Sequence, residues 1–260
     1  MSRFKKLFEV KQQRVLNVYC TAGYPFLDST TTVVNTLFAN GADIVELGMP
    51  YSDPLADGPV IQNSSSIAIS NGMEMQVLFN QLQQWNENTT ANKRGALVLM
   101  GYMNPVLQYG FEKFCANAAA VGVDGLILPD LPEYEFETEY GAIIKKYGLD
   151  FIFLVTPETS EARIKKLDSL STGFLYAVSS SSTTGSNKNM TDVDTYLQKL
   201  QTLHLNNPVL VGFGIKDKQS FDAACRHANG AIIGSAFIKA LENTNEVAAT
   251  TQNFLESILK

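Results

Sequence analysis

Two carboxylates lie close together in the sequence, in settings that favour acid–base chemistry. Glu46 interrupts the apolar run Ile44–Leu47, and Asp57 follows in the proline-rich segment Ser52–Pro59. Burying an ionised carboxylate without a partner is costly, and an apolar setting raises the pKa of a carboxyl group. A carboxyl group with a raised pKa can act as a general acid or base near neutral pH. We therefore predict that Glu46 and Asp57 are catalytic residues.

Each carboxylate also has a structural interpretation. Glu46 could form an ion pair with a Lys or Arg of a neighbouring strand, but none of the predicted strands contains either residue type. Asp57 could be a turn residue, and Asp53, which directly precedes a proline, could cap a turn. The prolines of the segment restrict its backbone, so that Asp57 can be held over Glu46 at low cost.

Glycines late in the chain form a second candidate site, for an anion. Gly212-Phe213-Gly214 and Gly234-Ser235 each follow an apolar run, and Gly185 lies in an earlier Ser- and Thr-rich segment. Backbone N–H groups and a helix N-terminus can bind a phosphate without a lysine. The alternative is that these glycines only permit tight turns.

Histidine chemistry and metal chemistry are not expected. His204 and His227 fall at the ends of predicted helices, before strands, and therefore away from the predicted site. The three cysteines, Cys20, Cys115 and Cys225, include no C-x-x-C pair. Their odd number argues against a disulfide framework and fits a reduced cytoplasm. We expect no metal and no cofactor in this chain.

Eight short apolar runs, each followed by a helical segment, would position these groups. Near-continuous apolar strands that alternate with helices indicate a parallel sheet buried on both faces. Eight such units in 260 residues, 45% of them hydrophobic, predict an α/β fold, a single-domain (β/α)8 TIM barrel over residues 1–260. The runs are Leu16–Cys20, Ile44–Leu47, Ala96–Met100, Gly125–Leu128, Phe151–Val155, Phe174–Val178, Val209–Val211 and Ala231–Ile233.

The segments between the runs carry regular boundary signals. Asp28 and Ser160 are predicted helix N-caps, before Ser29–Asn40 and Glu161–Leu170. A glycine that can adopt a left-handed conformation and end a helix precedes four of the runs. These glycines lie in Asn40–Asp43, Val121–Asp124, Tyr147–Asp150 and Asn229-Gly230.

Three segments depart from the simple alternation. Met1–Arg14 is amphipathic and is either a targeting peptide or a helix that caps the barrel; Glu9 and the lack of a cleavage signal favour the helix. Long loops follow the second and sixth strands, at Gly48–Pro59 and Ser179–Thr191. Long loops at the carboxyl ends of barrel strands are usually functional lids, and surface disorder is the alternative for the second loop.

The charge balance limits the partners. The net charge is −6 and no basic stripe is visible, so nucleic acid is not an expected partner. No apolar run approaches the ~18 residues that span a bilayer, so no membrane span is expected.

The segment Val45–Pro59 closely resembles the signature of tryptophan synthase α subunits. The resemblance implies a carbon–carbon lyase of tryptophan biosynthesis, which cleaves indole-3-glycerol phosphate to indole and glyceraldehyde 3-phosphate by a retro-aldol reaction. Further matches extend along nearly the whole chain, at Tyr19–Pro25, Met103–Pro105, Pro129–Pro132, Thr184-Gly185, Gly212–Ile215 and Gly234–Ala236.

The resemblance also implies roles for individual residues. Glu46 matches the catalytic glutamate, and Asp57 matches an aspartate that assists at the indole nitrogen. Tyr19 matches an aromatic residue lining the indole pocket, and Tyr176 matches a tyrosine beside the substrate. The remaining implied substrate contacts are Thr184, Gly185, Gly214, Gly234 and Ser235, the last four of them at the phosphate.

A protein partner follows from the same resemblance. Family α subunits pair in the cytoplasm with a β subunit that carries pyridoxal phosphate, as an α2β2 assembly, and the region Met103–Pro105 matches part of the contact surface. The chain departs from the family pattern at two places. Tyr24 stands where some members have an aspartate facing the partner, and Ser179–Ser182 lie where many members have a glycine or an arginine before Thr-Gly.

Three other functions compete with this one. A sugar-phosphate isomerase or decarboxylase barrel would usually need a Lys or His at the barrel mouth, and neither type follows a predicted strand directly. A non-catalytic activator would not need both Glu46 and Asp57. A free-standing lyase that releases indole would show high turnover alone.

Overall fold

Nine parallel strands form one sheet in the part of the chain that the computed structural model describes, residues 2–88, 94–178, 190–212 and 214–260. The sheet order is β5-β4-β3-β2-β1-β9-β8-β7-β6, and its end strands β5 and β6 are consecutive in the chain, so the sheet closes into a barrel. The strands are β1 (Val15–Thr21), β2 (Ile44–Gly48), β3 (Ala96–Met100), β4 (Gly125–Ile127), β5 (Asp150–Phe151), β6 (Leu154–Val155), β7 (Leu175–Val178), β8 (Val209–Gly212) and β9 (Gly230–Ile233).

The fifth predicted strand, Phe151–Val155, is divided into β5 and β6, and the prediction of one continuous strand was wrong. Side-chain hydroxyls, rather than backbone carbonyls, accept from two N–H groups of this segment. The Phe151 N–H donates to Oγ1 of Thr172 at 2.9 Å, and the Phe153 N–H donates to Oγ of Ser171 at 3.1 Å. The barrel still closes across the break, because the Ile152 N–H donates to the Leu126 carbonyl and the Tyr176 N–H donates to the Phe153 carbonyl.

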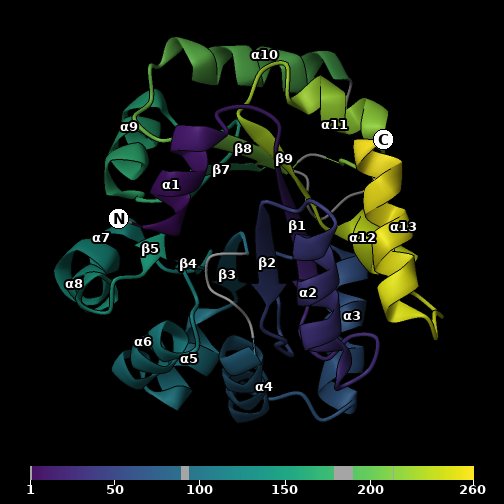
Figure 1. Ribbon diagram of the computed structural model, residues 1–260. Helices are drawn as coiled ribbons and strands as arrows, with labels where there is room; N and C mark the ends of the chain where they lie inside the picture. The colour runs from purple at the N-terminus through teal and green to yellow at the C-terminus, as the bar shows by residue number, and fades with distance from the viewer. Residues whose placement is uncertain (1, 89–93, 179–189, 213) are drawn as a thin grey trace.

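Helices surround the barrel, as Figure 1 shows. None of the described helices is long and apolar enough to cross a membrane. The helices are α1 (Arg3–Val10), α2 (Ser29–Ala39), α3 (Pro59–Ser70), α4 (Met75–Asn88), α5 (Met103–Tyr109), α6 (Phe111–Ala120), α7 (Glu133–Glu135), η2 (Phe136–Tyr140, a π-helical turn), α8 (Gly141–Lys146), α9 (Glu161–Leu170), α10 (Met190–Thr202), α11 (Lys218–Ala224), α12 (Ser235–Ala240) and α13 (Val247–Leu259).

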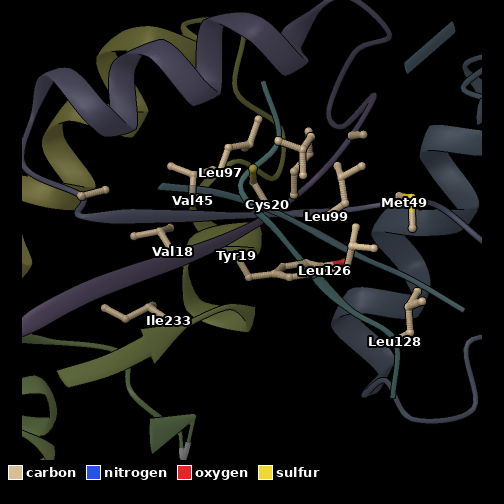
Figure 2. Close-up of a cluster of buried hydrophobic side chains, with 14 of the residues drawn as sticks. Val18, Tyr19, Cys20, Val45, Met49, Leu97, Leu99, Leu126, Leu128 and Ile233 are labelled. Atoms are coloured by element: carbon tan, nitrogen blue, oxygen red, sulfur yellow. The ribbon is translucent and has the colours of Figure 1, made fainter. Parts of the chain in front are cut away.

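Alternation along the strands separates two apolar cores. Successive strand residues face opposite sides, so one set packs under the helices and the other fills the barrel. Figure 2 shows this on β1, where Tyr19 and Cys20 are adjacent in sequence and point to opposite sides of the strand. The inner core consists of Phe4, Val15, Ile44, Ala96, Val98, Ile127, Ile152, Phe174, Leu210 and Ile232. A residue two positions after an inner-core residue on its strand therefore faces the barrel interior.

Helix α1 caps the amino-terminal end of the barrel, as the sequence predicted for this region (Figure 1). Ser2 caps the helix by accepting a hydrogen bond from the Lys5 N–H. Phe4 is fully buried, belongs to the inner core, and has its ring centroid 6.0 Å from that of Phe174. The Nε of Arg3 lies 3.1 Å from Oδ1 of Asp124 and adds an ion pair to this attachment.

Truncating Phe4 is expected to destabilise the barrel without touching its chemistry. Phe4→Ala leaves a cavity in the inner core, and we expect a loss of about 3 to 5 kcal/mol in the free energy of unfolding. Urea denaturation followed by circular dichroism measures this loss. Val10→Ala is the matched control, because Val10 lies on the same helix and is 89% exposed. Equal stability of the two variants would show that α1 does not close the core.

Some local predictions need correction. Asp28 precedes α2 as expected but its side chain makes no capping hydrogen bond, whereas Ser160 caps α9 by accepting from the Arg163 N–H. Gly41, Gly122 and Gly148 have positive φ angles, but Gly230 does not; it is the first residue of β9, packed so closely on the backbone of Val15 that no Cβ would fit. The loop predicted at Ser179–Thr191 ends earlier, because α10 begins at Met190, and residues 179–189 lie outside the described part of the chain.

Candidate active site

Glu46 lies inside the barrel. It follows the inner-core residue Ile44 by two positions on β2, and its side chain is 1% exposed. The sequence left open whether this carboxyl group faces the interior or the helix layer, and the structure places it in the interior. In the parallel register, Glu46 lies between Tyr19 on β1 and Val98 on β3.

Among the described residues, one side-chain hydrogen bond holds the carboxyl group of Glu46. Nδ2 of Asn17 donates to Oε2 at 2.8 Å, and Oε1 has no hydrogen-bond partner within the described ranges. Burial raises the pKa of Glu46 to about 8, the bond from Asn17 lowers it, and the charge of Asp57 raises it. No cation of the described chain contributes to this shift, so the ion-pair interpretation of Glu46 has no support here.

Asp57 is held on the neighbouring barrel unit. The loop after β2 is attached to the residues after β3: the Met49 N–H donates to the Met100 carbonyl, and the Ala56 N–H donates to Oη of Tyr102 at 3.1 Å. Oη of Tyr102 in turn donates to Oδ2 of Asp57 at 2.9 Å. One tyrosine hydroxyl therefore fixes both the loop backbone and the carboxylate.

The pKa of Asp57 is also raised, but to a lower value than the pKa of Glu46. Burial raises the pKa of the half-buried Asp57 to about 6, and the hydrogen bond from Tyr102 lowers it. Asp53, in the same loop, is exposed and accepts a hydrogen bond from the Ser52 hydroxyl, in keeping with its predicted place in a turn. The two catalytic candidates thus differ in pKa and would carry different charges near pH 7.

Two tyrosines approach the carboxylates from β1 and β7. Burial raises the pKa of Tyr19 and of Tyr176, and the negative charges of both Glu46 and Asp57 raise each further, which places all four groups near one another. Glycines make room for both rings. A Cβ at Gly48 would collide with Oη of Tyr19, and a Cβ at Gly212 would lie 2.7 Å from Cε2 of Tyr176.

The predicted anion site is described only in part. Gly214 follows β8, with a φ of +54° and open space where a Cβ would be, and Gly234 and Ser235 follow the neighbouring strand β9. Thr184 and Gly185 lie outside the described residues, as does Phe213. His204 and His227 precede β8 and β9, at the other end of the barrel. Among the described residues, no three His, Cys, Asp or Glu side chains gather as a metal site.

Sequence reasoning did not single out two residues of this site, Asn17 and Tyr102. Asn17 interrupts the apolar run Leu16–Cys20 as Glu46 interrupts its own run, and that signal could have been used. Tyr102 follows β3 by two residues, in the loop beside the one that carries Asp57. Adjacent strands of a parallel barrel bring their carboxyl-end loops together, and that geometry could have drawn attention to it.

Comparison with known proteins identifies the family. The family model described as tryptophan synthase alpha chain matches residues 4–259. The chain belongs to the tryptophan synthase alpha chain family. It is 50% identical to the alpha chain of Flavobacterium johnsoniae over 235 residues, which cover 90% of this chain and 91% of that protein. It is 43% identical to the alpha chain of Parabacteroides distasonis over 259 residues, 99% of each chain.

Solved structures of the tryptophan synthase family share the fold. Tryptophan synthase subunit alpha from Legionella pneumophila is 31% identical, with a TM-score of 0.89 over 99% of this chain and 97% of that chain. A chain of the Pyrococcus furiosus tryptophan synthase complex is 32% identical, with a TM-score of 0.84 over 96% and 99%. The predicted (β/α)8 barrel is confirmed. So is the implied function, a carbon–carbon lyase of tryptophan biosynthesis that cleaves indole-3-glycerol phosphate.

Proposed function

We propose that Glu46 is the general acid and base of this cleavage and that Asp57 stabilises the charge that develops on the indole. Indole is a poor leaving group until its C3 is protonated. Protonation at C3 gives an indoleninium ion, which accepts the electron pair of the C3–C3′ bond as that bond breaks. The 3′-hydroxyl loses its proton as the 3′-carbon becomes the aldehyde of glyceraldehyde 3-phosphate.

One carboxyl group can perform both proton transfers. Protonated Glu46 gives its proton to C3 and, as a carboxylate, then takes the proton of the 3′-hydroxyl, which returns it to its starting state. A general acid whose pKa lies near the working pH is suited to this cycle. Burial raises the pKa of Glu46 to about 8, which meets that requirement.

Asp57 has a complementary task. The indole nitrogen becomes positive after C3 is protonated, and a carboxylate that accepts a hydrogen bond from its N–H stabilises that charge. With a pKa of about 6, Asp57 is mostly ionised at neutral pH, when Glu46 is mostly protonated. Environments that separate the pKa values of two carboxyl groups are the usual sign of separate acid and anion roles.

The substrate would lie between these groups and the glycine loops. We place the indole ring against Tyr19 and Tyr176, and the phosphate at Gly185, Gly214, Gly234 and Ser235, with Thr184 adjacent. The open space at Gly214 supports this placement. Binding of the phosphate, remote from the breaking bond, would fix the orientation of the substrate.

The observation that carries the proposal is the convergence of an interior carboxyl group of raised pKa with a second carboxylate and two tyrosines. The test is an assay of the purified chain with indole-3-glycerol phosphate, in which indole and glyceraldehyde 3-phosphate should form in equal amounts. An isomerase or decarboxylase would convert the substrate without releasing indole. A chain without activity, alone or with a β subunit, would be an activator.

The activity should depend on pH as a bell. Cleavage needs Glu46 protonated, so kcat/KM should fall as the pH rises through about 8; it needs Asp57 ionised, so kcat/KM should fall as the pH drops through about 6. Indole release measured between pH 5 and 10 gives the profile. A rate that keeps rising above pH 8 would contradict the acid role of Glu46.

We also propose that the chain acts in the cytoplasm with a tryptophan synthase β subunit, as an α2β2 assembly. The β subunit would carry pyridoxal phosphate, and this chain would need no cofactor, because its reaction consists of proton transfers. Three large apolar side chains after β2, β3 and β4, at one end of the barrel, are exposed: Leu55 (86%), Leu107 (48%) and Tyr134 (69%). Exposed large apolar side chains at the end of the barrel that carries Met103–Pro105 support a partner surface there.

Adding a β subunit separates this assembly from a free-standing lyase. We expect the α reaction to accelerate and the two chains to co-elute in size-exclusion chromatography. High turnover of the chain alone, with no gain from the β subunit, would favour the free-standing enzyme.

A further inference from the structure

Asn17 is a buried amide in an otherwise apolar run of β1. Its side chain is 0% exposed, two positions before Tyr19, and therefore one layer deeper in the barrel than Tyr19 and Glu46. Its backbone register places it beside Ile44 of β2 and Ile232 of β9, both inner-core residues. The side chain nevertheless reaches upward, and its Nδ2 donates to Oε2 of Glu46 at 2.8 Å.

The hydrogen-bonding pattern of Asn17 does not suit a structural role. A buried polar atom without a partner is destabilising, and an apolar side chain of the same volume would avoid that cost. Within the described part of the chain, Oδ1 of Asn17 has no hydrogen-bond partner. With the described residues, the amide therefore makes one bond, to Glu46, and its own oxygen makes none.

The bond from Asn17 makes the two oxygens of Glu46 unequal. Oε2 is held from below by the amide, while Oε1 has no partner among the described residues. A carboxyl group held by one oxygen cannot rotate freely about its last bond, and a fixed orientation is what a proton transfer to a carbon atom requires. An amide donor also favours the charged form of a carboxyl group.

We propose that Asn17 is a positioning residue for the lyase reaction: its amide holds Oε2 of Glu46, so that Oε1 is the oxygen that exchanges protons with the substrate. The inference rests on the proposed role of Glu46. Asn17 itself lies below the reacting atoms and would act only through Glu46. It would therefore affect turnover and the pH range of activity rather than substrate binding.

The other titratable groups that interact with Glu46 act on its charge in a different way, and one of them, Cys20, points to the opposite side of β1. Tyr19 and Cys20 on β1, Tyr176 on β7 and Asp57 in the loop after β2 all interact electrostatically with the buried site. Burial raises the pKa of Cys20 and of both tyrosines, so these three groups are neutral near pH 7. Asp57 is the facing anion, and it disfavours ionisation of Glu46. Among the described residues, Asn17 is the group whose hydrogen bond favours ionisation of Glu46.

The test is Asn17→Leu, which keeps the branched shape of the side chain and removes the donor. We expect kcat to fall roughly ten- to a hundredfold, with KM for indole-3-glycerol phosphate within about twofold of the native value. Loss of the bond should move the alkaline limb of the kcat profile to higher pH by about one pH unit. Ile232→Val is the control, because Ile232 is Asn17's register partner on β9 and makes no polar contact to lose. It should leave the limb where it is.

A second measurement does not depend on catalysis. The infrared absorption of the protonated Glu46 carboxyl group, identified by its loss in Glu46→Gln, should persist to higher pH in Asn17→Leu. If kcat falls but neither the pH limb nor the infrared titration moves, Asn17 is structural and the inference is wrong. Unchanged kcat in Asn17→Leu would also overturn it.

Two further outcomes remain distinguishable. If Asn17→Leu does not fold, Asn17→Ser replaces it, because the shorter side chain cannot overpack the core and its hydroxyl ends short of Glu46. The same shifts are then expected, and their absence has the same meaning. If Glu46→Gln retains native activity, the proposed function of Glu46 fails, while the infrared titration still reports whether Asn17 controls its proton.

Discussion

Replacing Glu46 with Gln should lower kcat by about 10²- to 10⁴-fold while the barrel stays folded. The glutamine amide keeps the volume of the side chain, and its oxygen can still accept the hydrogen bond that Nδ2 of Asn17 now donates to Oε2. What it loses is the proton that C3 of the indole must receive. KM should change little, since the phosphate and the indole ring are bound elsewhere. Indole release under saturating substrate measures the loss.

The control for Glu46→Gln is a second carboxyl group with a raised pKa. Asp150 is 8% exposed, burial raises its pKa, and Oδ2 has no hydrogen-bond partner among the described residues, but it begins β5 at the amino-terminal end of the barrel. Asp150→Asn should therefore keep native turnover. If Asp150→Asn lost as much activity as Glu46→Gln, the loss could not be assigned to the position of Glu46 in the site. If Glu46→Gln stayed within tenfold of the native rate, Glu46 would not be the general acid.

The position of Glu46 could be predicted because strand alternation is a local property. A single carboxylate in a run of buried apolar residues must face one of two layers, and either layer requires a reason for its presence. The same argument could have been made for Asn17, which also interrupts an apolar run. An uncharged amide costs less to bury than a carboxylate, so its presence there is weaker evidence for a function. The choice between the interior and the helix layer needed the pairing of Glu46 with Tyr19 and Val98, which no local pattern contains.

The contacts that fix Asp57 could not be predicted in the same way. Its partner Tyr102 is 45 residues away, and the bond depends on how two loops of adjacent barrel units pack. The prediction of one continuous fifth strand was wrong for a related reason. Its sequence is apolar throughout, but Ser171 and Thr172, from the segment before the next strand, take over two of its backbone donors. Apolar runs thus predicted the eight strand–helix units well, whereas the hydrogen bonds between units could not be predicted from the sequence.

The division of labour that we propose for the two carboxylates follows from their depth in the barrel. Glu46 lies on a strand, surrounded by the inner core and by side chains of neighbouring strands, and loses almost all contact with water. Asp57 lies in the loop above it and remains half-buried. Burial therefore raises one pKa to about 8 and the other to about 6. The same fold that positions the pair also keeps one of them protonated and the other charged near pH 7.

Asp57→Asn is the second substitution expected to have a large effect. Asparagine keeps the shape and can still accept the hydrogen bonds from Tyr102 and from the indole N–H, but it has no charge to stabilise the indoleninium ion. We expect kcat to fall about 10²- to 10³-fold, the range for loss of one group aimed at transition-state charge. Steady-state indole release measures this, with circular dichroism to show that the barrel is intact. An unfolded Asp57→Asn variant would mean that the residue is structural.

Two further variants show whether the effect of Asp57→Asn comes from the charge or from the position of the carboxylate. Asp53→Asn removes an exposed carboxylate from the same loop and should leave kcat unchanged, which excludes a general effect of loop charge. Tyr102→Phe keeps the charge of Asp57 but removes the hydroxyl that donates to it and accepts from Ala56. Since that bond lowers the pKa of Asp57, its loss should move the acid limb of the pH profile to higher pH. A loss in Tyr102→Phe as large as in Asp57→Asn would show that placement of the carboxylate, rather than its charge alone, limits the reaction.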